Sequence, residues 1–165
     1  LRYFNPVGSH KNFLIGDDPL QPRNLMPILN KSAFTKEKKI FIYGNDYKTK
    51  DGTAVRDYIH ISDLASSHTE CLKILNKIKN FEILNVGTGI DISIKDLAKE
   101  ISQTVGFKGK TEWDNTKPDG TLKKQLDVSK LMSLGWEPKI KLKEGIKDAI
   151  DSYKKEIAEN NFRET

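Results

Sequence analysis

The stretch "DGTAVRDYIHISDLA" at residues 51–65 holds the side chains whose types and spacing are best suited to chemistry. Arg56 and Asp57 follow a glycine-containing turn and lie on a strand-like run, directly before a segment with helical periodicity. The planar guanidinium group of an arginine in such a place can pair bidentately with phosphate oxygens, which predicts a diphosphate site. The same two residues could instead form a structural Arg–Asp pair at a strand edge, and the residue types leave both interpretations open.

Further positive charge follows a "KPDGT" loop, where Lys123 and Lys124 are neighbours in the chain. Two ammonium groups could neutralise a diphosphate, or they could simply be solvated. A metal centre is not indicated, because neither His60 nor His68 has a second ligand at metal-binding spacing. The single cysteine, Cys71, excludes an internal disulfide.

The charge pattern and the lengths of the apolar runs argue against nucleic acid and membranes as partners. The chain has 165 residues and a net charge of +5, which comes from lysines interspersed with acidic residues. This alternation is typical of solvated helix faces, and aromatic-basic clusters of the RNA-binding type are absent, so we expect no nucleic-acid partner. No apolar run approaches the roughly 20 residues that span a bilayer, and no signal peptide is evident. We therefore expect a cytoplasmic protein without membrane contact.

Strand-like and helical segments alternate along the chain, which predicts an α/β fold. Alternating or continuous apolar runs predict strands at 1–4, 39–44, 54–61, 81–89 and near 110–113. Apolar residues at helical spacing predict helices at 25–34, about 62–75, 94–106, near 127–136 and at about 142–158. Polar residues predicted to cap three of these helices are Asn24, Ser62 or Asp63, and Ser93.

Four segments resemble, in order and spacing, the C-terminal half of UDP-glucose 4-epimerases: "LRYFNPVGSH", "LIGDDPLQPRNLMPIL", "IFIYGNDYKTKDGTAVRDYIHISDLA" and "NVGTG". These enzymes belong to the NAD-dependent epimerase/dehydratase family of extended short-chain dehydrogenases, and the resemblance covers residues 1 to about 90. It implies a substrate-binding half that carries the last strands of a Rossmann sheet. Residues 1–165 would then form one partial domain, without the N-terminal NAD-binding part.

The resemblance implies that NAD is the cofactor, with Tyr3 and Phe4 near its nicotinamide end. It also implies that Asn5 contacts the sugar nucleotide. From the residue types alone, Tyr3 and Phe4 could equally serve strand packing, and Asn5 could be a turn residue before Pro6.

On the nucleotide side, the resemblance implies binding of a UDP-sugar. Asn24 and Leu25 would hold the diphosphate at the start of a helix, where free N–H groups favour anions. Phe41 and Tyr43 would flank the uracil, and Arg56 would clamp the diphosphate.

Residues 91–150 instead resemble the end of GDP-L-fucose synthase, a member of the same superfamily. This second resemblance implies that Asp119, Lys123 and Lys124 approach a GDP-sugar, with Leu122 where that family usually has proline. The Arg-x-Gly-Asp-like element expected of a 4-epimerase is missing from this region. The choice between UDP and GDP therefore stays open at this point.

Two motifs on which such enzymes depend do not occur in the sequence. There is no G-x-G-x-x-G or G-x-x-G-x-x-G turn to seat the cofactor pyrophosphate, and none of the five tyrosines has a lysine four positions later. We therefore expect no catalytic residue here and an inactive chain by itself, either a fragment or one half of a split enzyme.

The intact parent would be an isomerase of galactose metabolism that interconverts UDP-glucose and UDP-galactose. Its further partners would be the missing N-terminal half or a second copy of the chain. Two alternatives remain: a GDP-sugar epimerase or reductase of the GDP-L-fucose synthase type, and a non-catalytic nucleotide-sugar-binding module.

Overall fold

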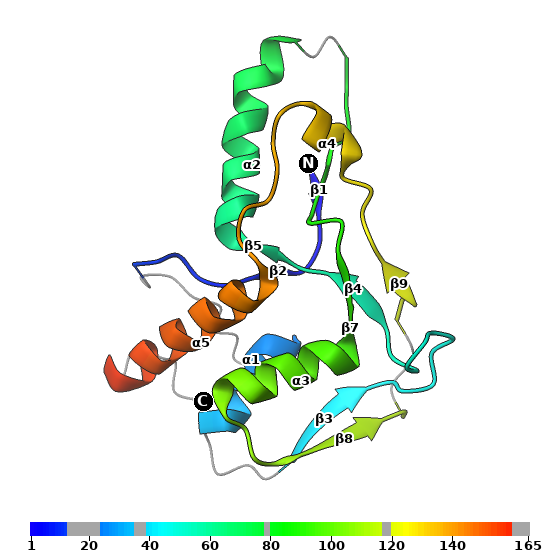
Figure 1. Ribbon diagram of the computed structural model, residues 1–165, viewed down its shortest axis with the longest axis vertical. Helices are drawn as coiled ribbons and strands as arrows, with labels where there is room; N and C mark the ends of the chain where they lie inside the picture. The colour runs from blue at the N-terminus through cyan, green and yellow to red at the C-terminus, as the bar shows by residue number, and fades with distance from the viewer. Residues whose placement is uncertain (13–23, 35–38, 78–79, 117–119, 160–165) are drawn as a thin grey trace.

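A computed structural model of the chain describes residues 1–12, 24–34, 39–77, 80–116 and 120–159. Strands and helices alternate through it, which confirms the α/β class (Figure 1). The strands are β1 Arg2–Tyr3, β2 Pro6–Val7, β3 Lys39–Tyr43, β4 Val55–Asp57, β5 Ile59–His60, β6 Asn85–Val86, β7 Asp91–Ser93, β8 Lys110–Asp114 and β9 Lys123–Lys124. The helices are α1 Leu25–Phe34, α2 Ile61–Ile74, α3 Ile94–Val105, α4 Ser129–Ser133 and α5 Leu142–Glu159, with a 3₁₀ turn, η1, at Leu75–Lys77.

The strands of the described residues pair into four small sheets. Three are parallel pairs, β1 with β6, β2 with β5 and β3 with β8. The fourth places β4 between β7, which is antiparallel to it, and β9, which is parallel. The predicted strand at 54–61 is thus divided into β4 and β5, and each part pairs in a different sheet. The sequence did not predict β2, β7 and β9.

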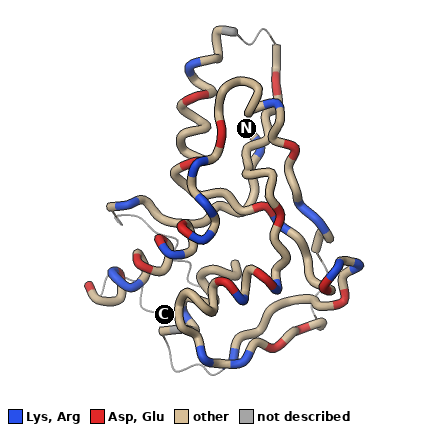
Figure 2. Tube along the Cα trace, viewed as in Figure 1, with Lys and Arg blue, Asp and Glu red and all other residues tan. Residues whose placement is uncertain are grey.

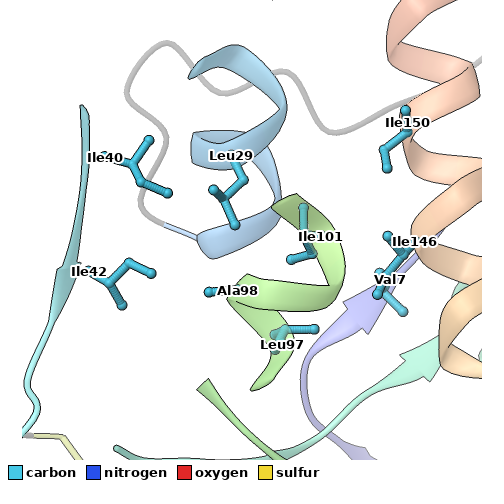
Figure 3. Packing of buried hydrophobic residues seen from close by; sticks show 9 residues of the cluster. All are labelled: Val7, Leu29, Ile40, Ile42, Leu97, Ala98, Ile101, Ile146 and Ile150. Atoms are coloured by element: carbon cyan, nitrogen blue, oxygen red, sulfur yellow. The ribbon is translucent and has the colours of Figure 1, made fainter. Parts of the chain in front are cut away.

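The larger hydrophobic core lies between β3 and three helices (Figure 3). Side chains alternate along β3, so that Ile40 and Ile42 are buried while Phe41 and Tyr43 are exposed. The remaining residues of this core come from β2, α1, α3 and α5: Val7, Leu29, Leu97, Ala98, Ile101, Ile146 and Ile150.

A second core lies beneath α2 and consists of Ile59, Leu84, Val86, Leu131 and Trp136. The apolar spacing that predicted this helix includes Leu72 and Leu75, which are not buried as an apolar face requires. Leu72 is 66 % exposed and Leu75, just beyond the helix, is 53 % exposed.

Polar residues are buried on α2 instead, and they attach the segment that leads to α5. Asp63 accepts hydrogen bonds from the backbone N–H groups of Lys139 and Ile140, at 2.9 and 2.8 Å. Trp136 donates its indole N–H to Ser66 at 2.9 Å. A buried carboxylate needs such hydrogen-bond partners. Asp63 and Ser66 therefore serve to hold the segment 136–140 against α2.

The N-cap of α2 is His60, which corrects the prediction of Ser62 or Asp63. Its Nδ1 accepts a hydrogen bond from the backbone N–H of Ser62 at 3.1 Å. The ring is buried, and Gly8 leaves room for it, since a Cβ there would lie 2.3 Å from the ring. A histidine is not a usual N-cap residue, so the local pattern did not reveal it.

The other two predicted helix starts agree with the structure. Ser93 caps α3 by accepting a hydrogen bond from Asp96 N–H at 3.1 Å. Helix α1 begins directly after Asn24, whose carbonyl accepts from Ile28 N–H at 3.3 Å. No helix of the described residues is long and apolar enough to cross a membrane.

The turn before β4 is tied to the start of α3. Asp51 accepts hydrogen bonds from the backbone N–H and the hydroxyl of Thr53, at 2.9 and 2.8 Å. The Thr53 hydroxyl in turn accepts from Lys95 N–H at 3.2 Å. Gly52 has a φ of 79°, and a Cβ there would lie 2.3 Å from the carbonyl oxygen of Asn45, so this position requires glycine.

We predict that Asp51 makes this turn sensitive to acid. Partial burial raises the pKa of Asp51, but hydrogen bonds from Ser93 and Thr53 and the charge of Lys95 together hold it below the usual 3.8. The carboxylate therefore stabilises the fold fully above that value, and this contribution is lost as the pH falls through the folded-state pKa. Asp51→Asn should show less loss of unfolding free energy than the wild type when urea denaturation is repeated below about pH 4.

Asp46→Asn is the matched control, because Asp46 is exposed in the same loop. It should lose stability with acid as the wild type does. An Asp51→Asn variant that follows the wild-type acid profile would contradict the assignment.

Candidate functional site

The register of β4 decides which charged side chains share a face of its sheet. Arg56 lies opposite Lys124 of β9, whereas Lys123 lies opposite Val55. Since successive side chains of a strand point to opposite faces, Arg56 and Lys124 share one face and Lys123 points to the other. The two lysines that are neighbours in the sequence are therefore separated in space, although both belong to the basic segment at β9 (Figure 2).

The two lysines differ in their partners. Lys123 Nζ lies 2.6 Å from Asp91 Oδ2, so its charge is neutralised within the chain. Lys124 Nζ instead lies over the ring of Phe4, 5.7 Å from the ring centroid. Phe4 was predicted to lie near the nicotinamide of NAD and Lys124 near the nucleotide sugar, and this contact brings the two together.

Arg56 also lacks a carboxylate partner among the described residues. Its Nη1 donates to the backbone carbonyl of Val55 at 2.7 Å and, more weakly, to that of Leu122 at 3.5 Å. Arg56 and Lys124 thus occupy opposite positions of the β4–β9 pair, and neither has a neutralising anion in the described part of the chain. Their mutual repulsion would be relieved by a bound anion.

The carboxylate of Asp57 is buried, with 2 % of the residue exposed, and it binds the turn at 85–89. It accepts hydrogen bonds from Thr88 N–H at 3.1 Å, from the Thr88 hydroxyl at 2.5 Å and from Gly89 N–H at 2.8 Å. Gly87 makes this approach possible, because a Cβ there would lie 2.6 Å from Asp57 Oδ2. The structural Arg–Asp pair considered from the sequence is not formed.

Asn5 fixes the chain between β1 and β2 against β4 and β5. Its Nδ2 donates to the carbonyl of Asp57 at 2.9 Å, and its own carbonyl accepts from Ile59 N–H at 3.3 Å. Its φ of 42° is in the left-handed region, which asparagine tolerates better than most residues. These hydrogen bonds give Asn5 a structural role, and its contact with substrate stays a prediction.

Two amides of the glycine-rich turn after β6 are bonded within the chain. The N–H groups of Thr88 and Gly89 donate to Asp57 and are not available to a phosphate. The ring of Tyr3 packs edge-on against His68, with 5.7 Å between the ring centroids. We therefore derive no chemical step through NAD from these residues.

The other predicted residues belong to β3 and to the start of α1. Phe41 and Tyr43 are about half exposed on the outer face of β3, at 52 % and 53 %. Asn24 and Leu25 stand at the start of α1. Hydrogen bonds and ring contacts of the described residues do not join these four to Arg56, and Asp119 lies outside the described residues.

One neighbour of Arg56 was missed from the sequence. The hydroxyl of Tyr47 accepts a hydrogen bond from Gly120 N–H at 2.8 Å. A Cβ at Gly120 would lie 3.8 Å from both Arg56 Nη2 and the Tyr47 hydroxyl oxygen, so all three groups border one position. Tyr47 follows Gly44 in a polar turn, and no local pattern marked it.

Tyr58, which lies between β4 and β5, is not suited to act as a base at neutral pH. Burial raises the pKa of Tyr58, next to Arg56, to about 12, although the Arg56 charge acts in the opposite direction. That hydroxyl stays protonated at neutral pH and cannot accept a proton there. No group of His, Cys, Asp and Glu residues in the described part could hold a metal ion.

Comparisons with known proteins show which family the chain resembles. A family model described as GDP-mannose 4,6 dehydratase matches residues 1–149. The chain is 47 % identical over 107 residues to a UDP-glucose 4-epimerase of Yersinia enterocolitica, covering 64 % of this chain and 31 % of that protein. It is 34 % identical over 153 residues to GDP-L-fucose synthase 1 of Arabidopsis thaliana, covering 93 % of this chain and 44 % of that protein.

A solved structure is also similar. The UDP-glucose 4-epimerase of Stenotrophomonas maltophila, with bound NAD and formylated UDP-arabinopyranose, superimposes with a TM-score of 0.87 at 33 % identity. The match covers 96 % of this chain and 48 % of that one. The chain thus spans about half the length, or less, of the relatives it matches.

We predict that Asp57 is required for stability. In Asp57→Asn, the amide nitrogen would face backbone N–H groups of Thr88 or Gly89, leaving buried donors without an acceptor. The free energy of unfolding should fall by about 3 kcal/mol, measured by urea denaturation. Asp46→Asn, at an exposed position, should change it by less than about 0.5 kcal/mol, and equal losses in the two variants would refute the role of Asp57.

Proposed function

The chain belongs to the GDP-mannose 4,6-dehydratase family of NAD-dependent sugar-nucleotide epimerases and dehydratases, and we propose that Arg56 and Lys124 bind the diphosphate of a nucleotide sugar. One observation carries this proposal: two cations share a face of the β4–β9 pair and have no carboxylate partner among the described residues. A diphosphate would neutralise both, and the guanidinium fork of Arg56 suits its oxygens.

We propose that the nucleoside is held elsewhere on the same half. The exposed rings of Phe41 and Tyr43 are available to contact a base. Asn24 and Leu25 stand at the first turn of a ten-residue helix, whose free N–H groups favour a phosphate. Asn5 would contact the substrate, as the resemblance to UDP-glucose 4-epimerases implies.

Lys123 has a smaller part in this proposal than the sequence suggested. Its ion pair with Asp91 must be broken or shared before it can bind a phosphate. Asp119 keeps the role implied by the resemblance to GDP-L-fucose synthase.

The whole enzyme that we propose is a 4-epimerase acting on UDP-sugars, in which residues 1–165 form one unit that binds and orients the substrate. NAD and the acid–base pair would be supplied mainly by residues outside this unit, with Tyr3 and Phe4 near the nicotinamide. The runner-up is a GDP-sugar epimerase or reductase. It is favoured by the similarity to GDP-L-fucose synthase 1, which extends over 93 % of the chain.

Calorimetric titration of the chain with UDP-glucose and GDP-mannose tests the proposal. We expect UDP-glucose to bind, and Arg56→Ala to weaken the affinity by about 10- to 100-fold, because a charged hydrogen bond contributes about 1.5–3 kcal/mol. Lys108→Ala is the control, since it removes an exposed lysine between α3 and β8 without altering affinity.

Two results would overturn parts of this proposal. Failure of the folded chain to bind either nucleotide sugar would refute the diphosphate site. Preferential binding of GDP-mannose that is lost in Lys123→Ala/Lys124→Ala would leave the site in place and replace the UDP-sugar by a GDP-sugar.

A further inference from the structure

The contact between Phe4 and Lys124 joins two segments that are 120 positions apart in the sequence. Phe4 lies in the turn between β1 and β2, and Lys124 ends β9. The ammonium group lies 5.7 Å from the ring centroid, within the distance at which the face of an aromatic ring attracts a cation. The contact therefore holds the end of a flexible side chain against a ring.

Lys124 and Arg56 occupy opposite positions in the β4–β9 pair, so their like charges repel each other. Strand β9 has only two residues, and both are exposed. Without the ring, the four-carbon stem of Lys124 would be free to carry its charge away into solvent.

The neighbouring lysine is held in a different way. Asp91 fixes Lys123 at 2.6 Å and neutralises it in doing so. The ring of Phe4 fixes Lys124 without supplying a negative charge, so the full positive charge remains available to an anion. The ion pair with Asp91 holds Lys123 and neutralises its charge, whereas the ring of Phe4 holds Lys124 and leaves its charge available to an anion.

The residues on both sides of Phe4 are held by hydrogen bonds or strand pairing, one of them to the strand that carries Arg56. Asn5, the next residue, donates from Nδ2 to the carbonyl of Asp57 at 2.9 Å. On the other side, Tyr3 pairs with Val86 in the β1–β6 sheet. The backbone of Phe4 is therefore fixed on both sides, which limits the movement of the ring that Lys124 contacts.

We propose that Phe4 is a positioning residue for anion binding: its ring holds the ammonium group of Lys124, still charged, on the face of the β4–β9 pair that also carries Arg56. This inference rests on the proposed diphosphate site. It requires that the affinity for a diphosphate depend on an aromatic ring at position 4, and that this dependence disappear when Lys124 is removed.

A double-mutant cycle tests the inference, with UDP as the probe because it lacks the sugar that Phe4 could touch directly. Calorimetry on the full chain compares the wild type with Phe4→Leu, Phe4→Tyr, Lys124→Met and the double variant Phe4→Leu/Lys124→Met. Phe4→Leu should weaken UDP binding by about 2- to 5-fold, whereas Phe4→Tyr, which keeps a ring face, should bind as the wild type does. In the Lys124→Met background, Phe4→Leu should have no further effect.

Two outcomes would overturn the inference. An equal loss from Phe4→Leu with and without Lys124 would mean that the ring acts through packing or touches the ligand itself. Tighter binding by Phe4→Leu would mean that the ring competes with the anion for the lysine. The melting temperature of each variant is measured as well, and if Phe4→Leu unfolds early, Phe4→Met replaces it in the cycle. A failed diphosphate site is distinguished because the wild type would then not bind UDP, or Arg56→Ala would leave binding unchanged.

Discussion

The buried carboxylate of Asp57 is the interaction on which the arrangement of the site depends. A carboxylate removed from water must find hydrogen-bond donors, and Asp57 finds three in Thr88 and Gly89. The backbone carbonyl of the same residue accepts from Asn5. One residue therefore connects β4, the turn after β6 and the chain between β1 and β2, and it sets the position of Arg56 next to it.

The charged residues around β4 have different tasks because their partners differ. Asp57 and the Lys123–Asp91 pair are satisfied within the chain and contribute to structure. Arg56 and Lys124 are held by groups that carry no net charge, namely backbone carbonyls and the ring of Phe4. Residue type alone does not distinguish the two groups, since each contains a lysine. The partner of each cation decides whether its charge is available to a ligand.

The sequence predicted those elements that are determined by residues close together in the chain. Helix α3 and its cap Ser93 follow from periodicity and a polar residue at the right place, and α1 begins after Asn24 as expected. The cap of α2 and the partner of Asp57 could not be predicted in this way. His60 is an unusual cap, and Thr88 lies 31 residues from Asp57. Strand β9, with two residues, is too short to show an alternation, so the separation of Lys123 from Lys124 was hidden as well.

The similarity to enzymes of both UDP- and GDP-sugars has a physical reason if the proposed site is correct. Arg56 and Lys124 would contact only the diphosphate, which the two classes of substrate share, so this part of the site does not distinguish them. The choice of base must then fall to residues away from β4, such as Phe41 and Tyr43 on the outer face of β3. A diphosphate site at β4 and a base site at β3 can therefore change independently, because they belong to different sheets.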